Sequence, residues 1–411
     1  MLGSMKVLYF HQHFSTPQGA SGTRSYEMAR RLLERGHQVT LVCGSYGAGR
    51  TELVQPFVKG VRRGLVDGID VIEFELPYLN RDGFIRRTIT FLKYAWRSVL
   101  LALRHDYDLV LATSTPLTAG IPGIAASVVR RKPFVFEVRD LWPELPREMG
   151  VITNPLLLVA MSALEWVSYH TARACIGLAP GIVAGIQRRG ISADRVYLVP
   201  NGCDLDLFGE AATEPWRPEG VLETDLMAVF TGAHGIANGL DAALDAAAEL
   251  KRRNRNDIKL VMIGDGKLKP ALMNRAQREG LDNCVFHSPV PKVKLSGLMR
   301  SADVGLMILA NVPAFYFGTS PNKFFDYIAS GVPVLNNYPG WLAALIEEHL
   351  CGIAVPPGDA GAFADALEKM ADNRSALLEM GGNGRMLATR EFDRRLLADR
   401  FVNVLEAVAP A

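Results

Sequence analysis

The residues with the clearest capacity for chemistry lie in one segment of the second half of the chain, Gly318 to Val334. Within it, Ser320 and Pro321 are typical of a helix start, because a hydroxyl caps the first free N–H groups and proline fits the first turn. The segment predicts a helix that runs to Ser330 and ends at Gly331. Its N-terminus would bind an anion, since the helix dipole places about half a positive charge there.

Polar side chains near this helix start would extend the anion site. Lys323 adds a full positive charge, and Asn322 and Asp326 lie on the same side of the helix. A carboxylate at Asp326 can accept hydrogen bonds from ribose hydroxyls while a diphosphate rests on the helix end. On this pattern alone, an ordinary capped helix with a solvated lysine fits about equally well.

A second set of candidates lies in the first half of the chain. Gly22 and Thr23 open a predicted helix and could approach a phosphate, with Arg24 as the next residue. A glycine-rich loop of this kind also fits a dinucleotide site. Asp140 follows a short apolar run, so we expect it at the carboxyl end of a strand, where it could orient an acceptor hydroxyl or take its proton. The structural alternative for Asp140 is a helix cap or an ion pair with Arg139.

Short apolar runs alternate with helical stretches along the whole chain, and these elements must position the candidates. In the first half, strands are predicted at residues 6–10, 39–43, 109–113, 134–138, 174–178 and 196–199. In the second half, they are predicted at residues 226–231, 259–263, 284–287, 304–308 and 332–336. The alternation predicts an α/β fold with two doubly wound, Rossmann-like domains. Ligands bind beyond the carboxyl ends of such strands, so two facing domains would share one cleft.

The length of 411 residues allows more than one folded domain. The stretch from Glu210 to Glu223 is rich in proline, glycine and acidic residues and predicts a linker. We therefore expect an N-terminal domain over residues 5–209 and a C-terminal domain over residues 210–385. The remaining residues, 386–411, predict a helical segment that packs back toward the N-terminal domain.

Charge and cysteine content narrow the class of protein. The net charge of +2 gives no reason to expect nucleic acid as a partner. The five cysteines lie far apart without metal-ligand spacing, which is typical of reduced cytosolic thiols. No apolar run reaches the roughly 18 residues of a membrane span, and the residues before Met5 resemble an expression scar more than a signal peptide. We expect a protein of the cytoplasm or of the cytosolic face of a membrane.

The stretch from Ile85 to Arg104 predicts a basic amphipathic helix. Apolar residues recur at helical spacing, namely Ile89, Leu92, Trp96, Val99 and Leu103, and the interleaved cations are Arg86, Arg87, Lys93, Arg97 and Arg104. Such a helix suits an anionic membrane surface. On periodicity alone, a helix packed on its own sheet with a solvated charged face is slightly the better fit.

Six motifs spread over nearly the whole chain carry a resemblance to a known family. They occupy residues 21–27 together with 36–39, and then 137–143, 199–204, 263–266, 321–334 and 352–359. In this order they resemble the retaining glycosyltransferases of the GT-B fold in family 4, closest in style to the bacterial fucosamine-transferase-like enzymes of O-antigen and capsule synthesis. The resemblance implies a metal-independent enzyme without a cofactor. It implies transfer from a nucleotide-diphosphate sugar, with UDP favoured, to a lipid-linked or growing polysaccharide acceptor, by an enzyme that contacts the inner membrane face through residues 85–104.

The resemblance also implies where the substrates bind. The acceptor would lie in the N-terminal domain and the nucleotide sugar in the C-terminal domain. Gly264, Asp265 and Gly266 would line the nucleoside pocket, together with His287 and backbone groups of Val290. Asp326 would hold the ribose, as the second acid of the family's paired glutamates does.

Several positions depart from the family pattern. Gly318 stands where the first of the paired acids belongs, so backbone N–H groups around Thr319 and Ser320 would hold the sugar or phosphate. Two family cations fall near Ala233 and Asn238 and are missing. The cations left at the leaving group are Lys323 and Arg24, and the family's cleft histidine falls near Arg139, beside Asp140.

Three other functions remain open at this stage. A nucleotide-sugar epimerase of the same fold would need a carboxylate or histidine placed to move a ring proton, and no such pair is clearly marked. A nicotinamide-dependent dehydrogenase would need a full GxGxxG loop and an acidic residue at the end of the second strand, where Cys43 and Gly44 stand instead. A binding protein that has lost activity would account for the missing acid and cations.

Overall fold

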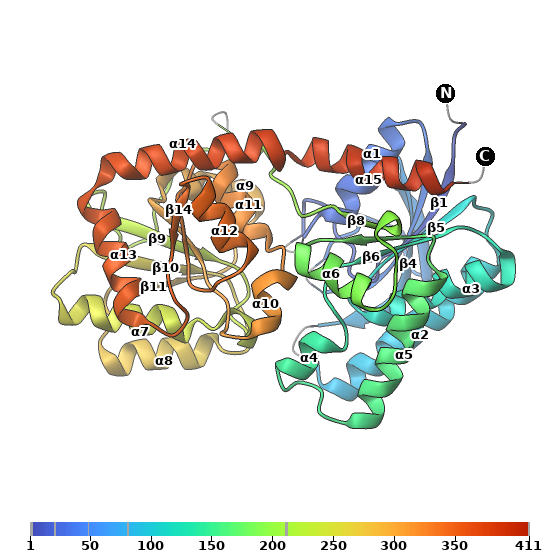
Figure 1. Ribbon diagram of the computed structural model, residues 1–411, viewed down its shortest axis with the longest axis horizontal. Helices are drawn as coiled ribbons and strands as arrows, with labels where there is room; N and C mark the ends of the chain where they lie inside the picture. The colour runs from blue at the N-terminus through green and yellow to red at the C-terminus, as the bar shows by residue number, and fades with distance from the viewer. Residues whose placement is uncertain (1–2, 20–21, 48, 80–81, 210–212, 410–411) are drawn as a thin grey trace. The chain divides into compact units, whose positions relative to one another are not determined.

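The computed structural model describes residues 3–19, 22–47, 49–79, 82–209 and 213–409. The chain folds into two compact units, drawn in Figure 1. Unit 1 comprises Met1–Pro200, Gly318–Ser320 and Arg395–Ala411, and unit 2 comprises Asn201–Phe317 and Pro321–Arg394. The first unit therefore ends at Pro200, before the expected boundary at residue 209, and the C-terminal return begins at Arg395, after the expected residue 386.

Part of the predicted linker belongs to unit 2. The Thr213 hydroxyl donates to the Val293 carbonyl at 2.6 Å, and the Trp216 indole N–H donates to the Lys294 carbonyl at 2.8 Å. These contacts fix the stretch on helix α9 (Lys292–Ser301). The prediction of a linker was wrong for these residues because tryptophan gains more from packing on a helix than from exposure. Residues 210–212 lie outside the described residues.

Unit 1 is built on an eight-stranded sheet. Its strand order is β3-β4-β2-β1-β5-β6-β7-β8. The strands are β1 (Lys6–Phe10), β2 (Gln38–Tyr46), β3 (Val61–Val66), β4 (Ile69–Tyr78), β5 (Leu109–Thr113), β6 (Phe134–Val138), β7 (Ala174–Gly177) and β8 (Val196–Leu198). The central strands β5 and β6 are buried along their whole length, which is why they are mostly apolar in the sequence, with Glu137 of β6 as the charged exception.

The hairpin of β3 and β4 was missed by the sequence prediction. β3 pairs antiparallel with β4, so the sheet is mixed instead of purely parallel. Its register places Arg62 opposite Glu73 and Arg63 opposite Ile72. Ion pairs join Arg62 to Glu73 at 2.8 Å and Arg63 to Asp70, diagonally across the ladder, at 2.6 Å. These charges interrupt the apolar alternation by which an edge strand is usually detected.

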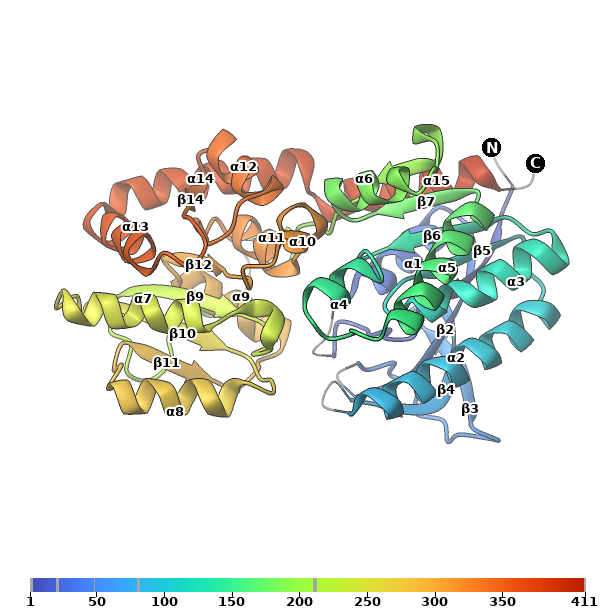
Figure 2. The same ribbon diagram turned by 60° about the horizontal axis from the view of Figure 1, so that its bottom comes forward.

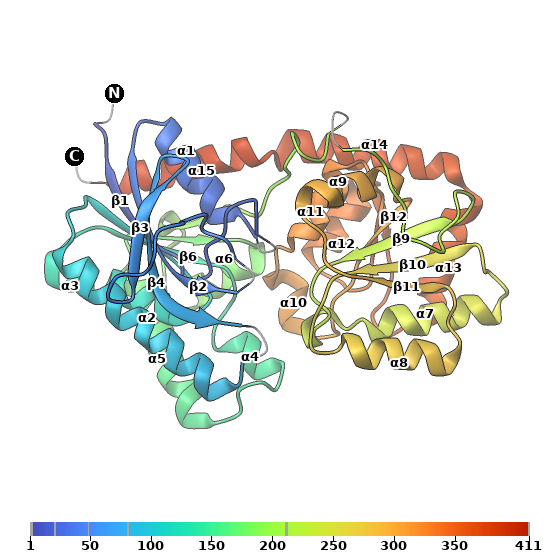
Figure 3. The ribbon, with the colours of Figure 1, turned by 180° about the vertical axis from the view of Figure 1, so that it is seen from behind.

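Helices cover both faces of this sheet. They are α1 (Arg24–Glu34), α2 (Phe84–Arg104), α3 (Ile121–Arg130), α4 (Glu144–Glu148), α5 (Pro155–Thr171), α6 (Pro180–Arg188) and α15 (Arg394–Val408), with the short turns η1 (Leu117–Gly120) and η2 (Ala193–Arg195). α2, α3 and α5 pack in succession against one another and form one layer (Figures 2 and 3). α1 packs against α15, where Arg31 forms an ion pair with Asp399 at 2.7 Å.

Unit 2 has a six-stranded, wholly parallel sheet of order β11-β10-β9-β12-β13-β14. The strands are β9 (Leu226–Thr231), β10 (Ile258–Ile263), β11 (Cys284–His287), β12 (Val304–Met307), β13 (Val334–Asn336) and β14 (Gly352–Ala354). Its helices are α7 (Asp241–Arg252), α8 (Lys269–Glu279), α9, α10 (Pro313–Gly318), α11 (Asn322–Ala329), α12 (Trp341–Glu348), α13 (Ala360–Asp372) and α14 (Arg374–Glu391), with the turn η3 (Ile236–Asn238). The prediction of two Rossmann-like α/β units is confirmed, and β14 is a strand that it lacked.

Candidate functional site

The carboxyl ends of three neighbouring strands meet at one edge of the unit 2 sheet. In the register, Ile263 at the end of β10 pairs with Thr231 of β9 and with His287 of β11. The loops that follow pack backbone against backbone. A Cβ atom on Gly264 would lie 1.9 Å from the Gly232 carbonyl oxygen, and Gly264 has a φ of +153° that favours glycine. The glycines predicted to line the nucleoside pocket are therefore required by the close approach of these loops.

Lys323 lies in the first turn of α11 and points back toward the loop after β9. Its ammonium donates to the Asn238 Oδ1 at 2.7 Å and lies 4.1 Å from the centroid of the Phe230 ring. Within the described part of the chain, no carboxylate forms an ion pair with it. Burial lowers the pKa of Lys323 to about 7. A bound phosphate would restore the charged form, so this lysine is suited to hold one.

The start of α11 differs from the prediction. The helix begins at Asn322, and its N-cap position is Pro321 instead of Ser320, without a side-chain cap hydrogen bond from that position. Thr319 and Ser320 also group with unit 1, whereas Lys323 belongs to unit 2. The lysine and the first turn of α11 therefore both belong to unit 2.

Asp326 lies one turn further along α11 and is only 5% exposed. Its Oδ1 lies 3.4 Å from the ammonium of Lys292, a residue that the sequence analysis did not select. Lys292 also lies 5.5 Å from the centroid of the Phe208 ring. The carboxylate thus has a cationic partner of its own within unit 2.

His234 is a candidate that the sequence analysis missed. It follows β9, is fully buried, and neither ring nitrogen has a hydrogen-bond partner among the described residues. Burial lowers its pKa to about 4, with a further contribution from Lys269, so the ring is neutral near pH 7. Buried polar atoms nearly always have a partner. A ligand in contact with the loops after β9 and β10 could provide this partner. The signal in the sequence was a histidine three residues beyond a predicted strand.

The other predicted nucleoside contacts are ordered by local hydrogen bonds. Asp265 Oδ1 accepts from the Gly266 N–H at 2.8 Å, and Nδ1 of His287 lies 2.7 Å from the Ser288 carbonyl oxygen. The Lys269 ammonium donates to the carbonyls of Gly264 and His287 at 2.8 and 2.9 Å. These bonds hold two loops together at the strand ends. Val290, also predicted here, lies half-buried in the segment after β11.

In unit 1, the contacts of Arg24 differ from its predicted role. Its Nε donates to the Glu137 Oε1 at 2.7 Å, and its two terminal nitrogens donate to the carbonyls of Pro200 and Val199 at 2.6 and 2.8 Å. The side chain is 5% exposed. Arg24 therefore joins β6 to the segment after β8, and the assignment as a leaving-group cation is corrected. Thr23 is the N-cap residue of α1, without a side-chain cap hydrogen bond.

Glu137 is the centre of this buried network. It also accepts from the Thr113 hydroxyl at 2.6 Å and lies 3.4 Å from the Nε of Arg139. Burial acts to raise the pKa of Glu137, but Arg24 and Arg139 outweigh it and hold the pKa below its usual value. Glu137 is thus an ionised carboxylate inside the unit, and the sequence analysis gave it no role.

Arg139 and Asp140 follow β6, as predicted, but they do not pair with each other. The Nε of Arg139 donates to the Thr113 hydroxyl at 2.8 Å and its Nη2 to the Ser25 hydroxyl at 2.9 Å. Asp140 accepts from the Thr115 hydroxyl at 3.1 Å. Burial raises the pKa of Asp140. A carboxylate with a raised pKa is a better proton acceptor, which suits a general base.

Three consecutive polar residues at the end of β1 lie beside this group, and sequence reasoning missed them. His11, Gln12 and His13 each have at least one buried side-chain atom without a hydrogen-bond partner among the described residues. Burial lowers the pKa of His13 to about 3, and its ring stacks on Tyr78 with centroids 4.9 Å apart. Neutral, unpaired polar groups at a strand end are suited to contact a polar ligand.

A cavity of about 630 Å³ adjoins this strand end. Its lining includes Gly44, whose N–H donates to the Gln12 carbonyl at 3.0 Å, and the side chains of Tyr46, Arg50 and Glu73. Its volume lies in the usual range of ligand pockets. In the described ranges, no three His, Cys, Asp or Glu side chains are grouped so as to hold a metal ion.

Comparison with known proteins shows which families and relatives this chain resembles. The profile described as Glycosyltransferase Family 4 matches residues 21–207, and the profile described as Glycosyl transferases group 1 matches residues 226–373. The D-inositol 3-phosphate glycosyltransferase of Nocardia farcinica is 30% identical over 206 residues, 48% of this chain and 44% of that protein. The O-antigen chain mannosyltransferase C of Escherichia coli is 24% identical over 239 residues, 56% of this chain and 59% of that protein. The chain thus spans about half the length of the curated relatives it matches.

A solved structure extends the similarity to the whole fold. The Anabaena protein HepE in complex with UDP superimposes with a TM-score of 0.67 at 18% identity, covering 98% of this chain and 100% of that one. At this identity the likeness shows the fold alone. The narrower likeness to fucosamine transferases stays a prediction.

Proposed function

The chain belongs to family 4 of the glycosyltransferases and has their GT-B fold, and from this premise we propose that it transfers a sugar from a nucleotide-diphosphate sugar to an acceptor hydroxyl. Lys323 is the observation that carries the proposal. It is a half-buried cation with a lowered pKa, in the first turn of α11 and next to the loop after β9. A diphosphate is the anion that this arrangement would stabilise.

The chemical role of Lys323 follows from the bond that breaks. When the anomeric C–O bond is cleaved, negative charge develops on the departing nucleoside diphosphate. A preorganised cation and the N–H groups of the first turn, including that of Asn322, stabilise this charge. One such group is commonly worth about 3 kcal/mol, or roughly a hundredfold in rate. The transfer would need no metal ion if these groups suffice.

The nucleoside would lie along the loops after β9, β10 and β11. His234 could donate or accept one hydrogen bond, the loop from Gly264 to Gly266 would approach the ligand through its backbone, and Asp326 would hold the ribose. His287 and Val290 would line the base. UDP is the favoured nucleotide, in keeping with the UDP bound by the similarly folded Anabaena protein.

In unit 1 the acceptor would be handled by the group at the ends of β1 and β6. Asp140 would orient the acceptor hydroxyl or take its proton, since its pKa is raised. Arg139 would position the neighbouring hydroxyls, and the acceptor would extend into the adjoining cavity, which Tyr46 and Arg50 line. Transfer with retained anomeric configuration would proceed on one face of the donor sugar, with the leaving phosphate helping to accept the proton.

The acceptor is proposed to be lipid-linked or a growing polysaccharide of the cell surface, and the enzyme to work in the cytoplasm at the inner membrane face. Two observations support this setting. One relative is an O-antigen chain mannosyltransferase, and the predicted helix over residues 85–104 exists as α2, with Trp96 65% exposed. None of the helices in the described ranges is long and apolar enough to cross a bilayer.

A thermal-shift screen with UDP, GDP, ADP and TDP tests the donor site. A nucleotide at one hundred times its dissociation constant adds about 2.7 kcal/mol to the free energy of unfolding. We expect UDP to raise the melting temperature of the wild type, and Lys323→Met to abolish the rise. Lys369→Met, on the exposed side of α13, is the matched control. An equal UDP response in both variants would refute the assignment of Lys323.

A further inference from the structure

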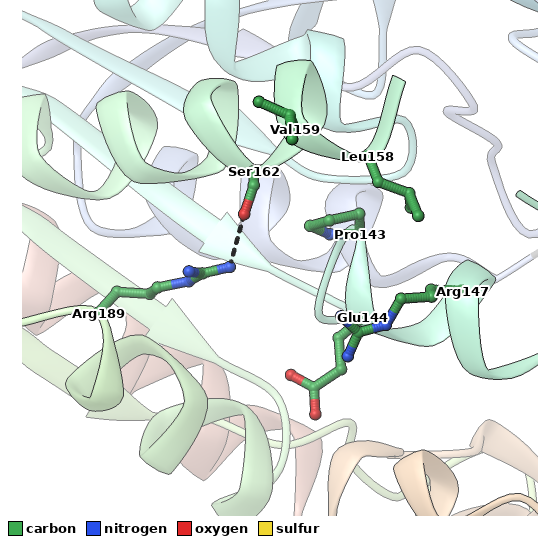
Figure 4. Close-up of a pocket in the computed structure, with 7 residues that line it drawn as sticks. All are labelled: Pro143, Glu144, Arg147, Leu158, Val159, Ser162 and Arg189. Atoms are coloured by element: carbon green, nitrogen blue, oxygen red, sulfur yellow. Dashed lines mark hydrogen bonds between the residues drawn. The ribbon is translucent and has the colours of Figure 1, made fainter. Parts of the chain in front are cut away.

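A cavity of about 220 Å³ lies between α4, α5 and the end of α6 in unit 1 (Figure 4). Its lining combines charged, hydroxyl and apolar side chains. They are Pro143, Glu144, Arg147, Leu158, Val159, Ser162 and Arg189. None of these residues belongs to the strand ends where the donor or the acceptor hydroxyl is proposed to bind. The cavity therefore requires a separate explanation.

The cavity has an excess of positive charge. Arg189 forms an ion pair with Glu165 at 2.6 Å and donates to the Ser162 hydroxyl at 2.9 Å, the contact drawn in Figure 4. Glu144 lies 3.5 Å from Arg188. Among the described residues, the guanidinium of Arg147 makes neither a hydrogen bond nor an ion pair. Its charge is thus uncompensated, and a guanidinium binds phosphate oxygens in a bidentate manner.

An apolar stripe runs along α5 directly beside the cavity. Leu156, Val159 and Trp166 are 80%, 68% and 50% exposed and follow one another at helical spacing. Leu158 and Ser162, which face the cavity, lie on the neighbouring side of the same helix. Asn154 caps α5 by accepting from two N–H groups of its first turn at 3.0 and 3.2 Å. A contiguous exposed apolar stripe usually indicates a site where a membrane or another molecule binds.

The layer formed by α2, α3 and α5 is positively charged, mainly through α2, and an anionic bilayer would attract it. α2 contains five cations and no acidic residue. Its Ile85 and Trp96 are 75% and 65% exposed to solvent. α3 exposes Val128 and Val129 by 64% and 66%. By contrast, α1 contributes no exposed large apolar residue on the other side of the sheet. The charge and the apolar residues thus lie on the same helix layer.

We propose that the cavity between α4 and α5 binds the headgroup phosphate of an anionic membrane phospholipid. Arg147 and Ser162 hold the phosphate oxygens, while Leu156 and Trp166 enter the acyl boundary beside it. Tryptophan suits that boundary because its ring is apolar and its N–H is polar. The inference rests on the membrane contact of the proposed function, but it concerns a different helix and a defined lipid site.

Vesicle flotation tests the site with the full chain. The vesicles are phosphatidylcholine alone, or equal parts of phosphatidylcholine and phosphatidylglycerol. We expect Arg147→Gln to weaken binding to the anionic vesicles about fivefold, the equivalent of about 1 kcal/mol for one cation at such a surface, without changing binding to phosphatidylcholine. Arg278→Gln, an exposed arginine of α8 in unit 2, is the matched control. Equal binding of the two variants would overturn the proposal.

A second pair of variants tests the apolar part. Leu156→Ser should weaken binding to both kinds of vesicle, whereas Leu378→Ser, at a leucine of α14 that is 81% exposed, should not. Inorganic phosphate distinguishes the source of the ligand. If phosphate alone stabilises the wild type but not Arg147→Gln, and the vesicle affinities of the two are equal, the cavity binds a soluble anion and the lipid assignment falls. The UDP-induced thermal shift, measured on the same variants, reports the donor site separately.

Discussion

Two cations that follow a loop and open a helix, Arg24 in unit 1 and Lys323 in unit 2, end in opposite surroundings. Arg24 is neutralised by Glu137 and by two backbone carbonyls. Lys323 has the amide oxygen of Asn238 and the ring of Phe230 near it, and no carboxylate partner among the described residues. A buried cation with a carboxylate partner supports the fold, whereas one without such a partner has charge left for a ligand. The available cation is therefore the better candidate for the leaving group.

The largest expected effect comes from removing the partner of Arg24. Glu137→Ala leaves Arg24 and Arg139 buried without their carboxylate, so the free energy of unfolding should fall by about 3–5 kcal/mol. Chemical denaturation measures this, with the exposed Glu52→Ala as control. A loss no larger than that of the control would mean that Arg24 is not tied down by Glu137, and the contrast between the two cations would disappear.

The next effect concerns the cation without a carboxylate. Lys323→Met should lower kcat/KM for sugar transfer by roughly a hundredfold, about 3 kcal/mol of transition-state stabilisation. The free energy of unfolding should not fall, because no ion pair is lost. Steady-state kinetics and denaturation on the same preparation separate the two readouts. A variant that is destabilised but fully active would reverse the roles assigned to Lys323 and Arg24.

The pKa of Lys323, about 7, predicts a pH dependence. The folded pKa lies below the ordinary value of about 10.4, so the unfolded chain binds more protons between these values. The free energy of unfolding should therefore rise with pH from about 7, by at most about 1.4 kcal/mol per unit. UDP affinity should fall over the same range, since the ligand binds the protonated amine. Calorimetry from pH 6 to 9 checks both, and Lys323→Met should lose both slopes.

The smallest expected effect concerns His234, which is neutral where Lys323 and Arg24 are cations. His234→Phe removes ring nitrogens that have no partner in the described protein, so stability should hold or increase. Nucleotide affinity should fall about fivefold, the value of one hydrogen bond of about 1 kcal/mol. Titration calorimetry with UDP measures it, and an unchanged affinity would show that the ligand does not contact this histidine.

Much of the fold could be predicted from the sequence because burial leaves a local pattern. β5 and β6 are mostly apolar, since both of their faces are covered, although β6 also contains Glu137. The hairpin of β3 and β4 could not be predicted in the same way. Its charged residues pair across the ladder, for example Arg63 with Asp70, and single strands carry no sign of such pairing.

The candidate site, like the fold, was in part predictable from the sequence and in part not. The sequence by itself determined two Rossmann-like units, the position of Asp140 after a buried strand, and a cation at the first turn of α11. Only the tertiary structure decided which cation lacks a carboxylate partner and that both ring nitrogens of His234 lack a hydrogen-bond partner among the described residues. The reason is physical: Glu137 lies 113 positions away from Arg24 along the chain, and a side chain's charge and hydrogen bonds depend on neighbours that folding brings from such distances.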